Sequence, residues 1–99
     1  MALPKNAETD LLFQSILFLQ SVEECYQYFE DLCTVREVQS ISQRLAVARM
    51  LAGGQSYQQT IAETGASSAT ISRVKRCLEY GAGGYQIVLE RLGKEEKAP

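Results

Sequence analysis

The stretch that decides the fold is residues 57–76, Tyr-Gln-Gln-Thr-Ile-Ala-Glu-Thr-Gly-Ala-Ser-Ser-Ala-Thr-Ile-Ser-Arg-Val-Lys-Arg. It has the layout of two short helices joined by a tight turn. Gly65 falls between them, where the turn needs a backbone that tolerates a positive φ. Small and aliphatic residues fall where the two helices should touch, namely Ile61, Ala62, Ala66, Ile71 and Val74. The spacing therefore predicts a helix-turn-helix from Tyr57 to Tyr80.

The flanking segments carry the signals that start and stop helices. Three have the capping-box pattern, in which a hydroxyl and a later carboxyl or amide bind free backbone N–H groups: Ser21-Val-Glu-Glu24, Thr34-Val-Arg-Glu37 and Ser56-Tyr-Gln-Gln59. Glycines follow the periodic runs, as expected at helix ends. No stretch alternates apolar and polar residues as a half-buried strand does. We therefore expect an all-α fold with about six helices.

Apolar residues recur at helical spacing and predict the inward face of each helix. Asp10 is expected to cap the first helix, and Ser67 the second helix of the helix-turn-helix. The expected faces, in chain order, are Leu12, Phe13, Ile16, Leu17 and Leu19; Val22, Cys25, Tyr26, Phe29 and Leu32; Val38, Ile41, Leu45, Ala48 and Leu51; Ile71, Val74 and Leu78; and Ile87, Val88, Leu89 and Leu92.

The chain of 99 residues is short enough for one domain. We expect a flexible arm over residues 1–9, a single helical domain over residues 10–93, and a disordered charged tail over residues 94–99. The hydrophobic share of 45% is high for so small a chain, and leaves open either a well-filled core or a subunit interface.

Charge is distributed unevenly along the chain. Residues 1–33 carry one base and six acids, whereas residues 34–78 carry six bases and two acids. The net charge of −2 therefore hides a basic segment that contains the helix-turn-helix. No acid lies between Gly65 and Arg76, although an exposed helix without a function usually mixes Glu with Lys.

This pattern favours DNA recognition by the second helix over a plain structural corner. Short hydroxyl side chains, alanine and arginine suit contacts with base edges, and lysine or arginine further along suits phosphates. The first helix can meet a phosphate with its N-terminal glutamines. The predicted DNA-binding residues are Gln58, Gln59, Ser67, Ser68, Ala69, Thr70, Ser72, Arg73, Lys75 and Arg76.

At these residues the sequence resembles the Trp repressor family, in particular its YerC/YecD branch. The resemblance covers most of the chain, and the helix-turn-helix is its most specific part. It is carried by Glu23-Glu-Cys-Tyr26, Asp31-Leu-Cys-Thr34, Gln43-Arg-Leu-Ala-Val-Ala-Arg-Met-Leu51, Thr64-Gly-Ala-Ser-Ser-Ala-Thr-Ile-Ser-Arg-Val-Lys-Arg76, Tyr80-Gly81 and Leu89-Glu-Arg-Leu92.

The resemblance implies an intertwined all-α homodimer that presents one recognition helix per subunit to successive major grooves. It also implies a sequence-specific transcriptional regulator, with a repressor as the expected kind. A small effector such as an amino acid is a further implication, and the matching residues are Thr34, Arg44 and Arg73. Three departures from the repressor bear on tryptophan: the stretch between Arg44 and Arg73 is one residue shorter, Val74 follows Arg73 in place of a glycine, and Val35 replaces a proline. They favour a DNA contact for Arg73.

Other readings stay open beside this one. A protein-interaction module on a repressor-like scaffold is the alternative, supported by the acidic first third and the sequence pI of about 5.1. An enzyme is not expected, because the chain has no histidine to activate a nucleophile. Three cysteines without a CxxC spacing predict neither a disulfide framework nor a metal site, and no other cofactor is expected. With no signal peptide or membrane segment in view, we expect the protein in the bacterial cytoplasm, and on the nucleoid when it is bound to DNA.

Overall fold

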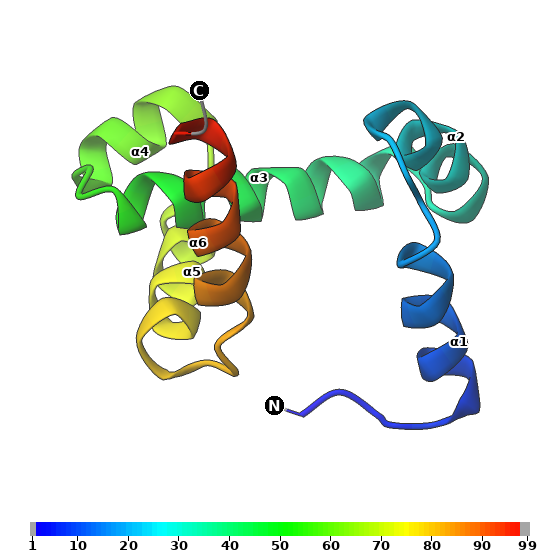
Figure 1. Ribbon diagram of the computed structural model, residues 1–99. Helices are drawn as coiled ribbons and strands as arrows, with labels where there is room; N and C mark the ends of the chain where they lie inside the picture. Colours follow the sequence, from blue (N-terminus) through cyan, green and yellow to red (C-terminus); the bar gives the residue numbers. More distant parts are fainter. Residues whose placement is uncertain (1, 98–99) are drawn as a thin grey trace. The chain divides into compact units, whose positions relative to one another are not determined.

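The structure is a computed structural model that describes residues 2–97, and helices with short connections make up this range without any strand (Figure 1). The all-α fold with about six helices is confirmed. In chain order the helices are α1 Ala7–Ile16, α2 Val22–Leu32, α3 Val35–Ala52, α4 Tyr57–Thr64, α5 Ser68–Tyr80 and α6 Gly84–Lys97.

The helices group into two compact units. The first unit ends at Val38 and the second begins at Gln39, so that α3 contributes its first turn to one and the rest to the other. We therefore describe each unit separately. The expected single domain over residues 10–93 stays a prediction.

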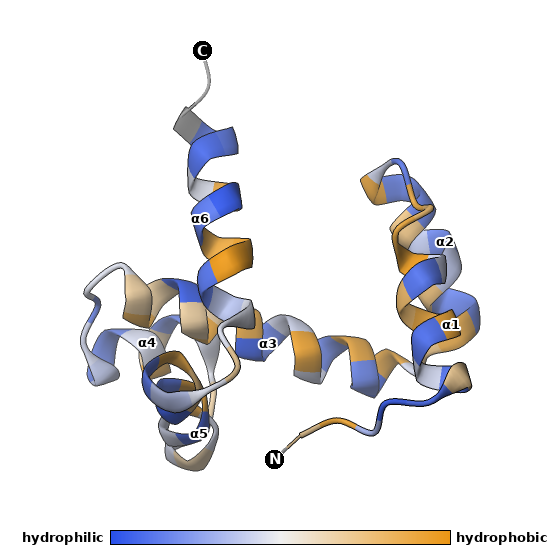
Figure 2. Cartoon of the chain, turned by 60° about the horizontal axis from the view of Figure 1, so that its bottom comes forward, coloured by the Kyte–Doolittle hydropathy of each residue, from blue (hydrophilic) through white to orange (hydrophobic). Residues whose placement is uncertain are grey.

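The first unit consists of α1, α2 and the start of α3, and it lacks a buried core of its own. Ser15 Oγ and Tyr28 Oη share a hydrogen bond of 2.6 Å that joins α1 to α2, and Phe29 meets the Tyr28 ring edge-on. None of the described residues in α1 or α2 is buried. Leu17 is 84% exposed and Phe18 80%. In Figure 2, which colours each residue by its hydropathy, hydrophobic positions recur along both helices.

This exposure corrects the predicted inward faces of α1 and α2. Leu17, Val22 and Tyr26 were expected to face inward, but all three are largely exposed in the single chain. The helical spacing is real, but no other element of the first unit buries these side chains. Apolar area of this kind is typical of an interaction surface.

The second unit has a small, well-buried core between α3 and α5. Val47 and Ala48 of α3 meet Ile71 and Val74 of α5, with Ala66 from the turn between α4 and α5. These side chains are at most 3% exposed. Burying one side chain of this size contributes about 1.5–3 kcal/mol. Four partly buried residues extend the core, namely Leu51, Leu78, Tyr85 and Leu89.

The structure changes the expected core in two helices. Val47 was not among the predicted inward residues of α3, whereas Ile41 and Leu45, which were, are 52% and 37% exposed. In α6, Ile87 and Val88 are likewise exposed rather than inward. The prediction followed one continuous apolar stripe, but α5 packs only on the C-terminal half of α3, where Val47 and Ala48 lie.

Several helix ends differ from the expected ones. α1 begins at Ala7 because Asn6 caps it by accepting from the Thr9 N–H at 2.9 Å, so the arm is shorter than residues 1–9 and Asp10 is not the cap. α1 also ends at Ile16, before Leu17 and Leu19. In the box at Ser21, the Glu24 carboxylate binds the N–H of Gln20 and not that of Ser21.

α6 runs through Gly93 to Lys97, where we expected a disordered tail from residue 94. Lys94 pairs with Glu90 one turn earlier at 3.2 Å, and Arg49 of α3 pairs with Glu96. These pairs offset the low helix propensity of glycine, which costs about 1 kcal/mol in a helix interior. Met1 and residues 98–99, which the predicted arm and tail include, lie outside the described residues.

Gly81 gives the first testable prediction. A Cβ placed on this residue would lie 2.3 Å from the Cys77 carbonyl oxygen, a backbone atom that cannot turn away. We expect Gly81→Ala to lower the free energy of unfolding by about 1–3 kcal/mol, as an overpacked site does. Gly84→Ala is the matched control, because nothing lies within 4 Å of its Cβ position. Thermal and urea melts of both variants measure the difference, and equal effects would contradict the clash.

Candidate nucleic-acid interface

The turn between α4 and α5 forms as the sequence predicts. Ser56 and Gln59 make the capping box at the start of α4, and Ser67 caps α5 by accepting from the Thr70 N–H at 3.1 Å. Gly65 closes α4 with φ of 69°, in the left-handed region, and its N–H binds the Ile61 carbonyl. The helix-turn-helix therefore occupies the predicted residues, with Gly81 as the C-cap of α5.

A buried threonine that sequence reasoning missed holds α4 in place. Thr60 is fully buried, and its hydroxyl donates to the Ser56 carbonyl at 2.8 Å. Thr64 donates to the Thr60 carbonyl and accepts from the N–H of Ala66, which ties the helix to the turn. Gln43 of α3 donates to the Thr64 carbonyl at 3.2 Å.

Ile61 and Ala62 were expected where the two helices touch, but both residues are exposed, Ile61 by 41%. The inward face of α4 passes through Thr60 instead. A threonine whose hydroxyl bonds to the preceding turn can enter a core with its polar group satisfied. The apolar pattern alone gave no signal for this, since threonine counts as polar there. Ala66, Ile71 and Val74 are buried as predicted.

The outward side of α5 carries the predicted DNA-binding residues. Ser68, Ala69, Ser72, Arg73, Lys75 and Arg76 are exposed, and Thr70 is half-buried. Ala69, Ser72, Arg73 and Arg76 are spaced by three, one and three residues, so they form one stripe along the helix. Gln58, at the start of α4, is exposed as well. We call the stripe with Ser68 and Lys75 the polar face of α5.

Two of the predicted contact residues are already used within the chain. The Gln59 side-chain oxygen accepts from the Ser56 N–H and hydroxyl, and Ser67 Oγ accepts from the Thr70 N–H while donating to its hydroxyl. Their first role is therefore to cap α4 and α5. Any contact that they make with DNA uses the polar groups outside these bonds, such as the amide hydrogens of Gln59.

Lys75 is oriented by an aromatic neighbour from α4. Its Nζ lies 5.4 Å from the centroid of the Tyr57 ring, within the range of a cation–π interaction. This contact joins the first turn of α4 to the middle of α5 and holds the ammonium group at the edge of the polar face. The sequence showed both residues but not that they meet.

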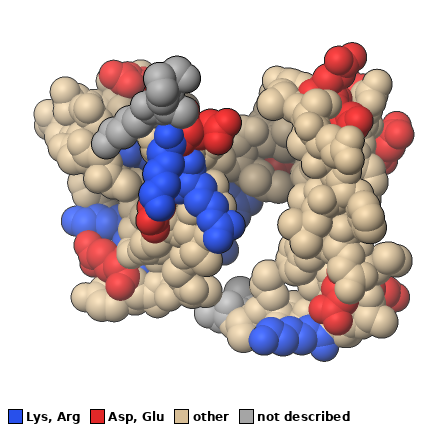
Figure 3. Space-filling view, viewed as in Figure 1, with Lys and Arg blue, Asp and Glu red and all other residues tan. Residues whose placement is uncertain are grey.

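Charge separates the two units in the way the sequence indicated. The first unit contains the acidic segment, and red side chains are spread over its surface in Figure 3. The second unit contains the basic residues of the helix-turn-helix, with Glu63 as the single acid of residues 57–76. Basic residues without neighbouring acids attract a polyanion before contact forms.

Of the three predicted effector residues, two form hydrogen bonds within the chain and one is exposed. Thr34 belongs to the first unit, where it forms a complete capping box with Glu37. Arg44 belongs to the second unit and donates to the Ser40 carbonyl and hydroxyl, at 3.4 and 3.1 Å. Arg73 is exposed on the polar face. The effector role of these three residues stays a prediction.

The described residues contain no group of three or more His, Cys, Asp or Glu side chains placed to hold a metal ion. Within the same range, every helix is too short or too polar to cross a bilayer. Cys25, Cys33 and Cys77 are free thiols of intermediate exposure.

The fold and this interface define an all-helical protein built around a helix-turn-helix. Comparison with known proteins makes the assignment specific. The family model for the Trp repressor protein matches residues 7–93, and the chain therefore belongs to the Trp repressor family.

Relatives by sequence and by structure agree with this assignment. The uncharacterized protein YerC of Bacillus subtilis (strain 168) is 55% identical over 92 residues, which is 93% of this chain and 88% of YerC. The crystal structure of a provisionally assigned Trp repressor from Staphylococcus aureus has a TM-score of 0.87 and 53% identity, over 90% of this chain and 89% of that one. A TrpR-like protein from Eubacterium eligens also gives 0.87, with 50% identity over 90% and 92%.

The capping box at Thr34 predicts a pH effect. A backbone hydrogen bond from Thr34, and then one from its side chain, lower the pKa of Glu37 below its ordinary value. A depressed pKa contributes stability above the unfolded pKa, and this contribution is lost as the pH falls through the folded pKa. Thr34→Ala keeps the backbone N–H and removes the hydroxyl. We therefore expect it to raise the pKa of Glu37 in an NMR titration by the part that the side chain contributes. Ser40→Ala, which removes a hydroxyl bound to Arg44, should leave it unchanged, and an unmoved pKa in Thr34→Ala would contradict the assignment.

Proposed function

We propose that this chain is a sequence-specific transcriptional regulator that binds double-stranded DNA as a homodimer, with α5 as the recognition helix in the major groove. A repressor is the expected kind, acting in the bacterial cytoplasm and on the nucleoid. Membership of the Trp repressor family supports a regulator in place of an enzyme.

The observation that carries the proposal is the polar face of α5. Its side chains are exposed, contain no acid before Glu79, and stand on a helix whose opposite side is fixed by Ile71 and Val74. A recognition helix needs this combination, because base readout requires side chains held at defined positions by a rigid scaffold. A structural corner needs only the buried side.

The residues take different roles in this proposal. Arg73 lies midway along the stripe and suits bidentate binding of guanine, while Ala69 suits a thymine methyl group. Ser68, Thr70 and Ser72 supply short hydroxyls near the helix start. Lys75, Arg76 and Gln58 lie at the borders, where phosphates pass, and they position the protein. Ser67 and Gln59 hold the two helix starts that face the DNA.

The exposed apolar side chains support the homodimer. In the first unit alone, Leu11, Leu17, Phe18, Val22 and Tyr26 are each at least 66% exposed. Large apolar side chains exposed to this degree favour an interaction surface in a small protein. A second copy of the chain is the simplest partner, because a twofold dimer presents two recognition helices to one palindromic site.

The alternative is a protein-interaction module that keeps the scaffold without binding DNA. The acidic first unit is the feature that favours it. Selection from random duplexes followed by a salt titration separates the two readings. A regulator should select a defined site, and its affinity should fall by roughly tenfold or more between about 50 and 200 mM salt. An interaction module should select nothing.

Arg73→Ala tests the readout itself. We expect the affinity for the selected site to fall by about 1–3 kcal/mol, with relaxed preference at one base position, because a bidentate guanine contact is lost. Arg91→Ala is the control, since it removes the same charge from α6, outside the helix-turn-helix. Unchanged preference in Arg73→Ala, or equal losses in both variants, would remove this role from Arg73.

The homodimer predicts a mass of twice 11.0 kDa in light scattering. Leu17→Glu should shift the equilibrium toward monomer, because it places a charge in apolar area that is 84% exposed in the single chain. Gln14→Glu, at an exposed polar position three residues earlier in α1, adds the same charge as a control. A wild-type protein that remains monomeric at all concentrations would overturn the dimer without touching the DNA-binding prediction.

A further inference from the structure

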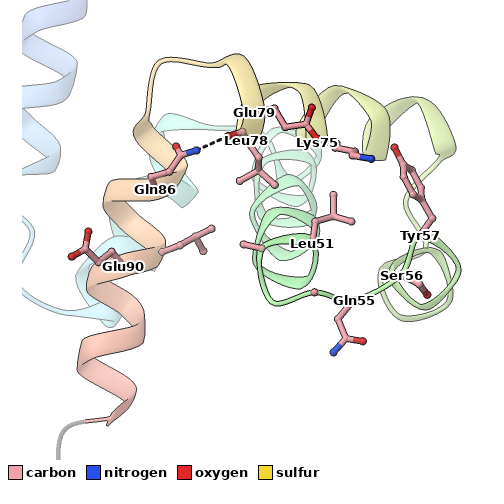
Figure 4. A pocket seen from close by; sticks show the side chains of 12 residues that line it. Leu51, Gln55, Ser56, Tyr57, Lys75, Leu78, Glu79, Gln86 and Glu90 are labelled. Atoms are coloured by element: carbon pink, nitrogen blue, oxygen red, sulfur yellow. Dashed lines mark hydrogen bonds between the residues drawn. The ribbon is translucent and has the colours of Figure 1, made fainter.

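The second unit contains an open groove that shares only Lys75 with the polar face of α5. It has a volume of about 750 Å³ and lies between the end of α3, the connection before α4, and helices α5 and α6 (Figure 4). Ligand pockets for small molecules span roughly 300–1,000 Å³, so the groove has room for one. Every residue that lines it belongs to the second unit.

The middle of the groove is apolar and the border is polar. Leu51, Leu78 and Leu89 come from α3, α5 and α6, and all three line the groove. Figure 4 shows the side chains of Leu51 and Leu78 within it. All three are only partly buried and pack against the core with their inner sides. Their outer sides therefore form an apolar floor that a ligand with a hydrocarbon body would cover.

The charged side chains along the border differ in whether they have partners. Lys75 points to the Tyr57 ring, with its Nζ 5.4 Å from the centroid. Glu90 is paired with Lys94 at 3.2 Å. Glu79 lies one helical turn after Lys75, and within residues 2–96, whose side chains are described, its carboxylate forms no ion pair. The groove thus offers one carboxylate without a countercharge beside an apolar floor.

We propose that this groove is a binding site for a small amphipathic amine. The ammonium group binds the Glu79 carboxylate, and the hydrocarbon body lies on Leu51, Leu78 and Leu89. The charges on the groove support a cation, because Glu79 is the lining carboxylate without an ion pair among residues 2–96, whereas Glu90 is paired with Lys94 and the Lys75 ammonium faces the Tyr57 ring. The Glu79 carboxylate would repel an anion of the same shape. That anion would gain no ion pair with Lys75 in return, because the Lys75 ammonium already faces the Tyr57 ring.

A ligand in the groove can affect the proposed DNA-binding surface, because the two surfaces share Lys75. Tyr57 of α4 and Lys75 of α5 both line it, and their contact sets the border of the polar face. An ammonium group near the Tyr57 ring competes with Lys75 for the same π surface. This link to DNA rests on the proposed function, whereas the binding site itself does not.

The test uses the full-length protein without DNA and three probes with the same six-carbon body: hexylammonium, hexanoate and 1-hexanol. Binding is followed by amide chemical shifts of the ¹⁵N-labelled protein. We expect saturable shifts at Leu51, Leu78 and Glu79 with hexylammonium, at a Kd on the order of 1 mM, which is reasonable for so few atoms. Hexanol should bind more weakly and hexanoate more weakly still.

Two variants make the result specific. Glu79→Gln should weaken hexylammonium about threefold to fivefold, the effect of losing one exposed ion pair, while Glu63→Gln, an equal charge change on α4 outside the groove, should not. Ala52→Phe fills the groove from an exposed position and should abolish the shifts. The proposal is overturned by the absence of saturable shifts, by hexanoate binding as well as hexylammonium, or by equal losses in the two glutamine variants. Since no DNA is present, its failure leaves the proposed function untouched.

Discussion

The packing of α5 on the C-terminal half of α3 is the constraint on which the second unit depends. Ile71 and Val74 meet Val47 and Ala48, and these four side chains make up most of the buried apolar volume. Because Ile71 and Val74 are three residues apart, they fix both the rotation of α5 about its axis and its position along α3. The rotation in turn decides which side chains of α5 point outward. A small core thus determines which side chains lie on the exposed face of α5.

The polar bonds around Thr60 complete what the apolar contacts begin. A short helix of eight residues has too few turns to be stable alone, so α4 needs tertiary anchors. Thr60 buries its methyl group while its hydroxyl stays bonded to Ser56, and Thr64 bonds to the turn at Ala66. The angle between α4 and α5 is therefore held by satisfied hydrogen bonds as well as by packing. That rigidity keeps the start of α4 and the exposed side of α5 in one fixed orientation to each other.

Local signals in the sequence were sufficient for the elements but not for the surfaces they bury. Capping residues and glycines predicted α4 and α5 within a residue, because cap geometry depends on neighbours in the chain. Val47 and Thr60 were missed for the opposite reason: which side of α3 or α4 faces inward depends on where α5 lands. Asn6 replaced Asp10 as a cap since both residue types suit the position. The continuation of α6 depends partly on Arg49, a residue 47 positions from its partner Glu96, which no local pattern contains.

The circumference of α5 is divided among three surfaces, and this division limits how the protein can vary. Ile71 and Val74 occupy the core side, and Leu78 with Glu79 the groove. The polar face carries Ser68, Ala69, Ser72, Arg73 and Arg76. Lys75 lies where the last two surfaces meet and is held there by Tyr57. A substitution on the polar face changes what can be contacted outside without disturbing the core. A substitution at Lys75 or Tyr57 affects two surfaces at once, so a change in the groove reaches the polar face through one contact and requires no movement of the helix.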